Sequence, residues 1–541
     1  MKKIIKYLFL LTGGSFILAS CNDFLDREPL DSVTPDNFFF TENDLAAYAV
    51  KHYNFTTHEG FNAGIWKNDN ATDNQAATDY DKKWIPGQWK VPEAYDNPAS
   101  NDPWYFSTIR EANYFLETVV PRFEKGEIEG SETNIKHYIG EMYFLRAKNY
   151  LSKLETFGDF PIIKNTLPDE SESLIQASKR APRYKVAHFI LEDLDQAISL
   201  LTNNISGGKN RITKNAALLL KSRAALFEAS WLTYHKGTAL VPGGPGWPGK
   251  AEDIADFNID TEIAFFLKEA KAAAKEVIGN AALVQNTAKD CMDETVKTDE
   301  DKYKMSNPYF AQFSANSLEG YSEILMWRAY NLLDYKIVHS APFYIRVGGN
   351  TGFTRQYVES FLCRDGKPIY ATDQYKGDES LLNVRKNRDL RLQLFLMTPG
   401  ETLSPNVMNG TPDLLPEVPQ LLDITEKRCV TGYQVRKGLS GNWYRDGNTA
   451  IEGCPVYRAA EAYLNYIEAD CMEHNGTSIG SEAAGYWGDL RERAGLPRDY
   501  TVTVNNTDLS KELDWAIYSA GKLVSPLLYN IRRERRCELL A

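Results

Sequence analysis

Residues 65–89 combine tryptophan rings with amide and carboxylate side chains in a stretch that has little helical or strand periodicity. Flat aromatic faces stack on the C–H surfaces of sugar rings, and amides and carboxylates bind sugar hydroxyls. Tryptophans that only fill a core more often lie within a regular apolar pattern, so this stretch favours a carbohydrate-contacting surface. The alternative is that the rings pack the loop onto the rest of the protein. The candidates are Trp66, Asn68, Asn70, Asp73, Asn74, Trp84 and Trp89.

Patterns for catalysis and metal binding are incomplete in this chain. The stretch 244–250 is similar to the start of a phosphate-binding loop, but Pro245 and Pro248 remove backbone donors and Ala251 lacks a hydroxyl for magnesium. The 7 histidines form no H-E-x-x-H pattern, and Ala71 breaks the calcium-loop spacing of the acids and amides around it. We therefore expect no catalytic residues, no metal site and no cofactor, and leave calcium binding open.

The N-terminus predicts export and lipidation. Three lysines precede an apolar run over 7–18, which is typical of a secretory signal. The run ends in Leu-Ala-Ser followed by Cys21, which is similar to a bacterial lipoprotein processing site; an ordinary signal with a chance cysteine is the alternative. We expect a signal peptide over 1–20, a lipidated Cys21, and a tether over 21–37. No later stretch approaches about 18 consecutive apolar residues, so we expect membrane attachment through the lipid anchor only.

Charge and cysteine content exclude further classes. The 541 residues carry a formal charge of −12, and an acidic chain is a poor partner for nucleic acid. Apart from Cys21, the cysteines show neither a C-x-x-C pair nor a repeated spacing, so they predict isolated buried thiols rather than a zinc site or a disulfide framework. A single disulfide is left open. These cysteines are Cys291, Cys363, Cys429, Cys454, Cys471 and Cys537.

Apolar residues recur every three or four positions in several segments, which predicts amphipathic helices. Within 186–201, for example, Phe189, Ile190, Leu194 and Ala197 fall on one helical face. The expected helices cover about 104–125, 135–157, 186–201, 213–234, 262–278 and 456–472.

These helices predict a mainly α fold, a tetratricopeptide-like helix-pair scaffold with a large irregular loop-and-strand ligand-binding insertion. Proline, glycine and asparagine become frequent over about 235–454, which we interpret as the insertion. We expect one domain over 38–541, with helix pairs at about 104–234, 262–280 and 456–541.

Several motifs, in their order along the chain, resemble the SusD/RagB family of outer-membrane nutrient-binding lipoproteins of Bacteroidetes. No single motif decides the assignment, but together they cover most of the sequence. They are Cys21-Asn-Asp-Phe24-Leu25-Asp26, Thr34-Pro-Asp-Asn-Phe38-Phe39, Gly140-Glu141, Phe144-Leu145-Arg146-Ala147, Phe157-Gly158-Asp159-Phe160-Pro161, Arg211-Ile-Thr-Lys, Arg388-Asp389-Leu390-Arg391, Tyr457-Arg458 with Glu461 and Glu468, and Arg493-Ala494-Gly495-Leu496-Pro497.

The resemblance implies a lipid-anchored protein on the cell surface of the outer membrane that caps a TonB-dependent, SusC-like transporter. Such proteins capture glycans, or less often peptides, and deliver them without chemistry. In the family the N-terminal loop region faces the ligand, as does the segment before a Thr-Gln motif. That segment adds a second tier of ligand-binding candidates: Tyr309, Trp327, Tyr330 and Tyr344.

Two departures from the family pattern stand out. Thr354-Arg355-Gln356 occupies the place of the usual Pro-Thr-Gln. The final helix, which contains Glu534 and Glu538, usually continues well beyond the position where this chain stops, so we expect either a truncated gene product or a fragment of a longer chain.

Three functions are compatible with these features. The leading hypothesis is a glycan-binding lipoprotein that is not an enzyme. With 73 acidic residues the sequence neither shows nor excludes the carboxylate pair of a cell-surface glycoside hydrolase, which is the second hypothesis. The third is a peptide-binding uptake lipoprotein.

Overall fold

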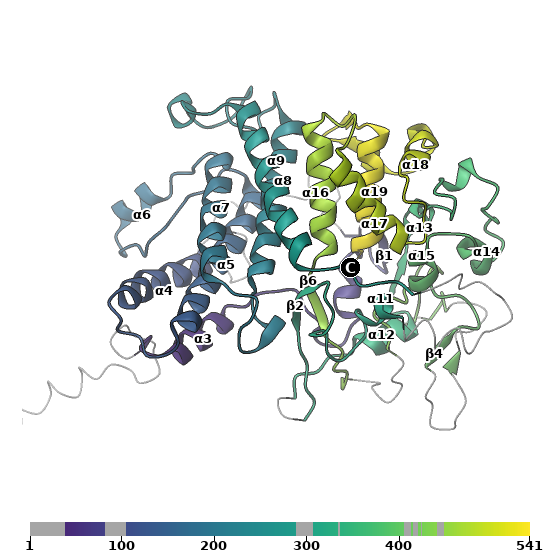
Figure 1. Cartoon of the computed structure of the whole chain (residues 1–541), viewed down its shortest axis with the longest axis horizontal. Helices are drawn as coiled ribbons and strands as arrows, with labels where there is room; N and C mark the ends of the chain where they lie inside the picture. Colours follow the sequence, from purple (N-terminus) through teal and green to yellow (C-terminus); the bar gives the residue numbers. More distant parts are fainter. Residues whose placement is uncertain are drawn as a thin grey trace, which may run out of the picture.

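Long helices make up one side of the molecule and short, irregular elements the other (Figure 1). The computed structural model describes residues 38–81, 104–287, 307–333, 336–404, 413–414, 420–423, 425–440 and 448–540. The expected signal peptide, Cys21 and tether lie outside these residues, as do Trp84, Trp89 and Cys291. Within the described part of the chain, no helix is both long enough and apolar enough to cross a membrane.

The scaffold is a sequential array of helices in which each one packs on the next. Helices α4, α5, α7, α8 and α9 contact one another in this order, and α9 then contacts α16, which packs on α17 and α19. The mainly α fold that the sequence predicts is therefore confirmed. The bounds are α3 Glu42–Lys51, α4 Ser107–Glu124, α5 Glu132–Phe157, α7 Arg183–Leu200, α8 Lys214–His235, α9 Ile259–Asn280, α16 Ala460–Glu473, α17 Ser481–Arg493 and α19 Pro526–Leu539.

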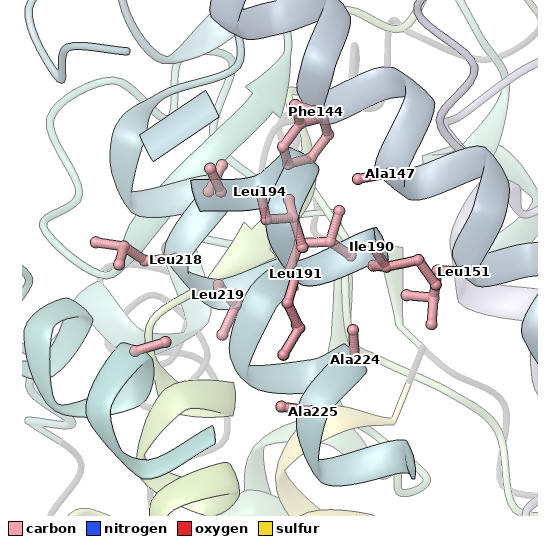
Figure 2. Close-up of a cluster of buried hydrophobic side chains, with 14 of the residues drawn as sticks. Phe144, Ala147, Leu151, Ile190, Leu191, Leu194, Leu218, Leu219, Ala224 and Ala225 are labelled. Atoms are coloured by element: carbon pink, nitrogen blue, oxygen red, sulfur yellow. The ribbon is translucent and has the colours of Figure 1, made fainter. Parts of the chain in front are cut away.

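Helices in the middle of this array bury residues on more than one face because they have neighbours on two sides. Figure 2 shows one such layer, in which side chains of α7 lie between those of α5 and α8. Small residues such as Ala224 and Ala225 on α8 allow close helix packing, and α9 likewise buries Ala270, Ala273 and Ala274. The labelled side chains are Phe144, Ala147, Leu151, Ile190, Leu191, Leu194, Leu218, Leu219, Ala224 and Ala225.

Local signals set the helix ends. Thr213 Oγ1 accepts a hydrogen bond of 3.2 Å from the backbone N–H of Ala216 and so caps α8. Helix α5 ends at Gly158, which has a φ of 72° and leads into the loop before α7. Asp159 then accepts a hydrogen bond of 2.8 Å from the backbone N–H of Arg183 at the start of α7. The Phe-Gly-Asp-Phe-Pro motif is thus a connection between two scaffold helices.

Between α9 and α16 the described chain forms short helices and short antiparallel strand pairs. Two pairs, β2 with β6 and β4 with β5, lie within this part, β3 pairs with β1 from the N-terminal loop, and a fourth pair, β7 with β8, follows later in the chain. The strands are β1 Gln75–Ala77, β2 Ile324–Arg328, β3 Thr351–Phe353, β4 Thr402–Ser404, β5 Asp413–Leu414, β6 Cys454–Arg458, β7 Tyr518–Ser519 and β8 Lys522–Leu523. The short helices between α9 and α16 are α11 Pro308–Ala311, α12 Ala341–Val347, α13 Arg355–Ser360, η5 Ile369–Ala371, α14 Leu381–Arg385 and α15 Leu390–Phe395. Those elsewhere in the chain are η1 Gly64–Lys67, α6 Ser171–Ala177, η3 Gly208–Asn210, η4 Ala251–Ile254, α18 Thr501–Asn505, η7 Leu509–Lys511 and η8 Trp515–Ile517.

A buried cluster of ion pairs joins the irregular part to the scaffold. Arg458 contacts Glu323 at 2.6 Å and Glu538 at 3.0 Å, and Arg493 contacts the same two carboxylates at 2.5 and 2.9 Å. Arg391 also reaches Glu538, at 3.2 Å. Three arginines from separate sequence motifs therefore converge on one glutamate of α19. These motifs hold the fold together in this chain.

The cysteines of the described chain are isolated thiols, as the sequence predicts. Five of them are buried and free: Cys363, Cys429, Cys454, Cys471 and Cys537.

Candidate functional site

The polar loop over 68–74 is fixed to the irregular part of the molecule by backbone pairing. Strand β1, which follows the loop, pairs with β3 so that Gln75 lies opposite Phe353. Asn70 Oδ1 accepts a hydrogen bond of 2.5 Å from Thr351 Oγ1, and the carbonyl of Asn74 accepts one of 2.9 Å from the N–H of Thr354. The loop is therefore held in one conformation.

Arg536 on α19 holds the other side of this loop. Its Nε donates to Asn74 Oδ1, and its Nη2 donates to the carbonyl of Asp73 at 3.0 Å. The carboxylate of Asp73 lies 3.4 Å from the same guanidinium and is about half exposed at 49%. Nη1 of Arg536 donates to Asp514 at 2.7 Å. Asn70 and Asn74 are therefore engaged within the protein, whereas Asn68 and Asp73 remain exposed to solvent.

The structure places Trp66 in a core. Its ring is 1% exposed and meets Phe313 edge to face at 5.9 Å. The ammonium of Lys437 lies 5.7 Å from the ring centre, and a Cβ added to Gly438 would come within 2.2 Å of the indole. Neither face of the ring is open to a sugar. The alternative interpretation, packing of the loop, therefore describes Trp66.

Three of the four second-tier aromatics are also buried. Tyr309 donates a hydrogen bond of 3.0 Å to Glu538, and Tyr330 donates one of 2.7 Å to the carbonyl of His58. Trp327 Nε1 donates to Glu319 at 3.0 Å. Tyr344 on α12 is different, because its ring is only partly buried. It is the one second-tier residue whose ring is partly open to solvent.

The structure nevertheless brings most of the predicted segments together. Trp66, Tyr309 and Tyr330 belong to one hydrophobic cluster, and Tyr344 packs on its edge. Helix α12 contacts η1, the short helix before Asn68. Trp327 packs elsewhere, against Leu318 and Ile324. The solvent-accessible part of the predicted site is thus Asn68, Asp73 and one side of Tyr344, and the rings of Trp66, Tyr309 and Tyr330 form a core. Trp84 and Trp89 remain predictions.

The buried environment of His58 and His339 disfavours a positive charge on the His58 imidazole. His58 and His339 lie with ring centres 4.7 Å apart, and burial together with His339 holds the pKa of His58 well below its usual value. His58 is therefore neutral at physiological pH. Across the described residues, no group of three or more His, Cys, Asp or Glu side chains is placed to bind a metal ion.

Family models match both ends of the chain. One, the SusD family, matches residues 296–541, and another, described as starch-binding associating with outer membrane, matches residues 23–226. The chain belongs to the SusD/RagB family. The resemblance that the sequence motifs indicate is therefore confirmed.

Relatives and solved structures agree with this SusD/RagB assignment. Two SusD-like proteins of Formosa agariphila are 27% identical over 203 residues and 26% identical over 258 residues. These matches cover 37% and 46% of this chain, and 37% and 45% of the relatives' own length. A SusD-like protein of Bacteroides fragilis superposes with a TM-score of 0.59 at 21% identity, covering 95% of this chain and 86% of that one. A SusD-like carbohydrate-binding protein of the same species gives 0.56 at 17% identity, covering 93% and 84%. At these identities the structural likeness shows the shared fold.

Among the exposed aromatic residues that sequence reasoning missed in this SusD/RagB chain, Trp515 and Tyr518 are neighbours. Trp515 is 80% exposed and Tyr518 is 43% exposed, on η8 and β7. They lie in a polar stretch with little periodicity, which is the same criterion that selected 65–89. The signal was present in the sequence, but a local pattern does not show which aromatic residues point outward.

Proposed function

We propose that this protein is a surface-exposed, lipid-anchored glycan-binding protein that captures oligosaccharide or polysaccharide and delivers it to a TonB-dependent outer-membrane transporter. Membership of the SusD/RagB family supports this function, as does the description of the N-terminal family model as starch-binding and outer-membrane-associated. The signal and lipidation pattern at Cys21 supports the anchor.

The observation that carries the binding proposal is the fixed polar loop. Pairing with β3 and the hydrogen bonds from Arg536 use the inward-facing groups of the loop, which leaves Asn68 and the carboxylate of Asp73 exposed. Because the loop is already ordered, binding a ligand there costs little conformational entropy. The amide and the carboxylate are suited to sugar hydroxyls, and the ring of Tyr344 offers a stacking face.

Affinity electrophoresis in polysaccharide gels tests this proposal. We expect Asn68→Ala, Asp73→Ala and Tyr344→Ala each to reduce the retardation of the purified protein, with unchanged thermal unfolding for the exposed Asn68 and Asp73. Ile175→Ala is a matched control, because Ile175 is also exposed and belongs to α6, which lies on the opposite side of the view from β1 (Figure 1). Full retention by all three variants would contradict the site. Release of reducing ends from the gel polysaccharide would instead favour a glycoside hydrolase.

A further inference from the structure

Four large apolar side chains are exposed on one short segment between α18 and α19. They are Leu513 at 75%, Trp515 at 80%, Tyr518 at 43% and Leu523 at 60% exposure. Exposure of a large apolar side chain forgoes the favourable free energy of its burial. Single exposed apolar residues are common on protein surfaces, but four within one segment mark a contact surface.

Two acidic residues next to the exposed apolar side chains, Glu512 and Asp514, face inward. Glu512 accepts hydrogen bonds from Tyr370 Oη at 2.8 Å and from Tyr529 Oη at 3.0 Å, and it pairs with Arg533. Asp514 is buried and accepts from Arg536 at 2.7 Å. Residues 512 and 514 thus point into the protein, whereas Leu513 and Trp515 point out. This reverses the usual arrangement of a surface loop, in which charged groups face water.

A tight hairpin continues the same surface. Ala520 and Gly521 both have positive φ, of 46° and 76°, which is the backbone of a two-residue turn between β7 and β8. Tyr518 and Leu523 are directly opposite each other in this pair, so their side chains share one face. The ring of Trp515 lies 6.3 Å from that of Tyr518, centre to centre, and the two planes are inclined by 41°. The segment therefore presents a fixed, bent pair of rings.

We propose that Trp515 and Tyr518 form a second carbohydrate-contacting platform, suited to a curved glycan whose consecutive sugar rings are inclined to one another. The proposal rests on the proposed glycan-binding function and adds a site and a ligand shape to it. Each ring offers a face to one sugar, and Leu523 extends the apolar surface beside Tyr518. A flat ribbon of sugars, as in β-1,4-linked glucans, would lie on only one of two planes inclined by 41°.

The size of the patch favours a sugar over a protein partner. A stable protein interface buries about 800 Å² on each side and involves about 20–30 residues. The platform offers four apolar side chains from one segment, whereas one or two rings suffice to stack sugars. Arg536 also links the platform to the polar loop, because its guanidinium contacts both Asp514, next to Trp515, and Asp73. One glycan chain in contact with both surfaces would bind more tightly than with either alone.

Two polysaccharides and four proteins test the inference. Amylopectin, an α-linked and curved glucan, and hydroxyethylcellulose, a flat β-linked one, are cast into separate affinity gels. Wild type, Trp515→Ala, Tyr518→Ala and the control Ile175→Ala are compared. We expect wild type and Ile175→Ala to be retained by amylopectin, with about tenfold weaker binding for Trp515→Ala and a smaller loss for Tyr518→Ala. Thermal unfolding of Trp515→Ala should match wild type, because its ring is exposed.

Each other outcome is decisive. If wild type is retained and Trp515→Ala is retained equally, the platform is overturned and the proposed function stands. If Trp515→Ala loses retention by hydroxyethylcellulose but keeps its retention by amylopectin, the inference that the platform selects a curved glycan is overturned. A wild type retained by neither gel overturns the platform and counts against the proposed function itself. If Trp515→Ala instead changes the mass measured by light scattering while retention is unchanged, the patch is an interface between copies of this chain.

Discussion

Tyr309 Oη lies 3.0 Å from both carboxylate oxygens of Glu538, from which it is separated by 229 residues of sequence. This contact ties the start of the irregular part to the last turn of α19. The same carboxylate pairs with Arg391, Arg458 and Arg493. Glu538 is therefore the point at which the irregular part and the C-terminal helices are joined, and its charge is needed because three guanidinium groups surround it.

We predict that Glu538→Gln strongly destabilises the fold. Removal of one partner from a buried ion cluster leaves charges uncompensated, which typically costs about 3–5 kcal/mol. Urea unfolding followed by circular dichroism measures the change. Glu132→Gln is the control, because Glu132 is 72% exposed and pairs with Lys136 on the surface, where solvent screens the contact. Equal stability of the two variants would contradict the role of Glu538.

The lowered pKa of Glu538 also predicts that the fold loses stability in acid. Burial alone would raise the pKa of Glu538, but Arg493, Arg458 and Arg391 together hold it below its ordinary value. A carboxyl whose pKa is lower in the folded state stabilises the fold above its unfolded pKa, and this contribution is lost as the pH falls. We expect the unfolding free energy of wild type to fall more steeply below about pH 4 than that of Glu538→Gln.

Lys437 predicts a second rise of stability with pH, in a neutral to alkaline range. Burial lowers the pKa of Lys437 from 10.5 to about 7, and Arg458 acts in the same direction. Between these values the unfolded chain binds more protons, so Lys437 destabilises the fold most at pH 7 and below and progressively less toward pH 10.5. Its ammonium lies among the rings of Trp66, Phe313 and Phe395.

Lys437→Met tests this prediction. The thioether fills the same aromatic surroundings without a charge, so we expect a gain of about 1–4 kcal/mol at neutral pH and a smaller gain at alkaline pH. Urea unfolding at a series of pH values gives the difference from wild type. A constant difference across the series would show that Lys437 does not titrate in this range.

Much of the scaffold follows from local sequence. The apolar repeat over 186–201 predicts a helix, and α7 spans Arg183–Leu200; the repeat over 213–234 corresponds to α8, Lys214–His235. These helices are visible in sequence because a repeat of three to four residues is a local property. Burial within the irregular part depends instead on distant partners, which a local pattern does not contain.

Trp66 and Trp515 show what the local pattern leaves undecided. Both lie in polar, weakly periodic stretches, yet one is 1% and the other 80% exposed. The difference arises from contacts far along the chain. Phe313 and Gly438 close around Trp66, whereas Arg536 draws Asp514 inward and so leaves Trp515 outside. Composition identifies the aromatic stretches, and tertiary packing decides which of them reach solvent.

We predict that Trp66→Ala lowers stability rather than acting on ligand binding alone. Removal of a large buried aromatic side chain costs about 3–5 kcal/mol because it leaves a cavity. Differential scanning calorimetry measures the loss, and Trp515→Ala, which removes the same side chain from an exposed position, is the control. Unchanged stability of Trp66→Ala together with weaker polysaccharide retention would restore Trp66 as a ligand contact.

Arg536 is predicted to position both carbohydrate-contacting surfaces. Lysine keeps the charge but cannot donate to Asn74, Asp73 and Asp514 at once, because it lacks the planar fork of arginine. Hydrogen exchange should therefore rise in Arg536→Lys over 70–77 and 512–518 while the scaffold helices keep their protection. Retention of Arg536→Lys in amylopectin gels should also fall. Arg355→Lys, at a 65% exposed surface pair, is the matched control. If exchange in both segments stayed at the wild-type rate, Arg536 would not be their common support.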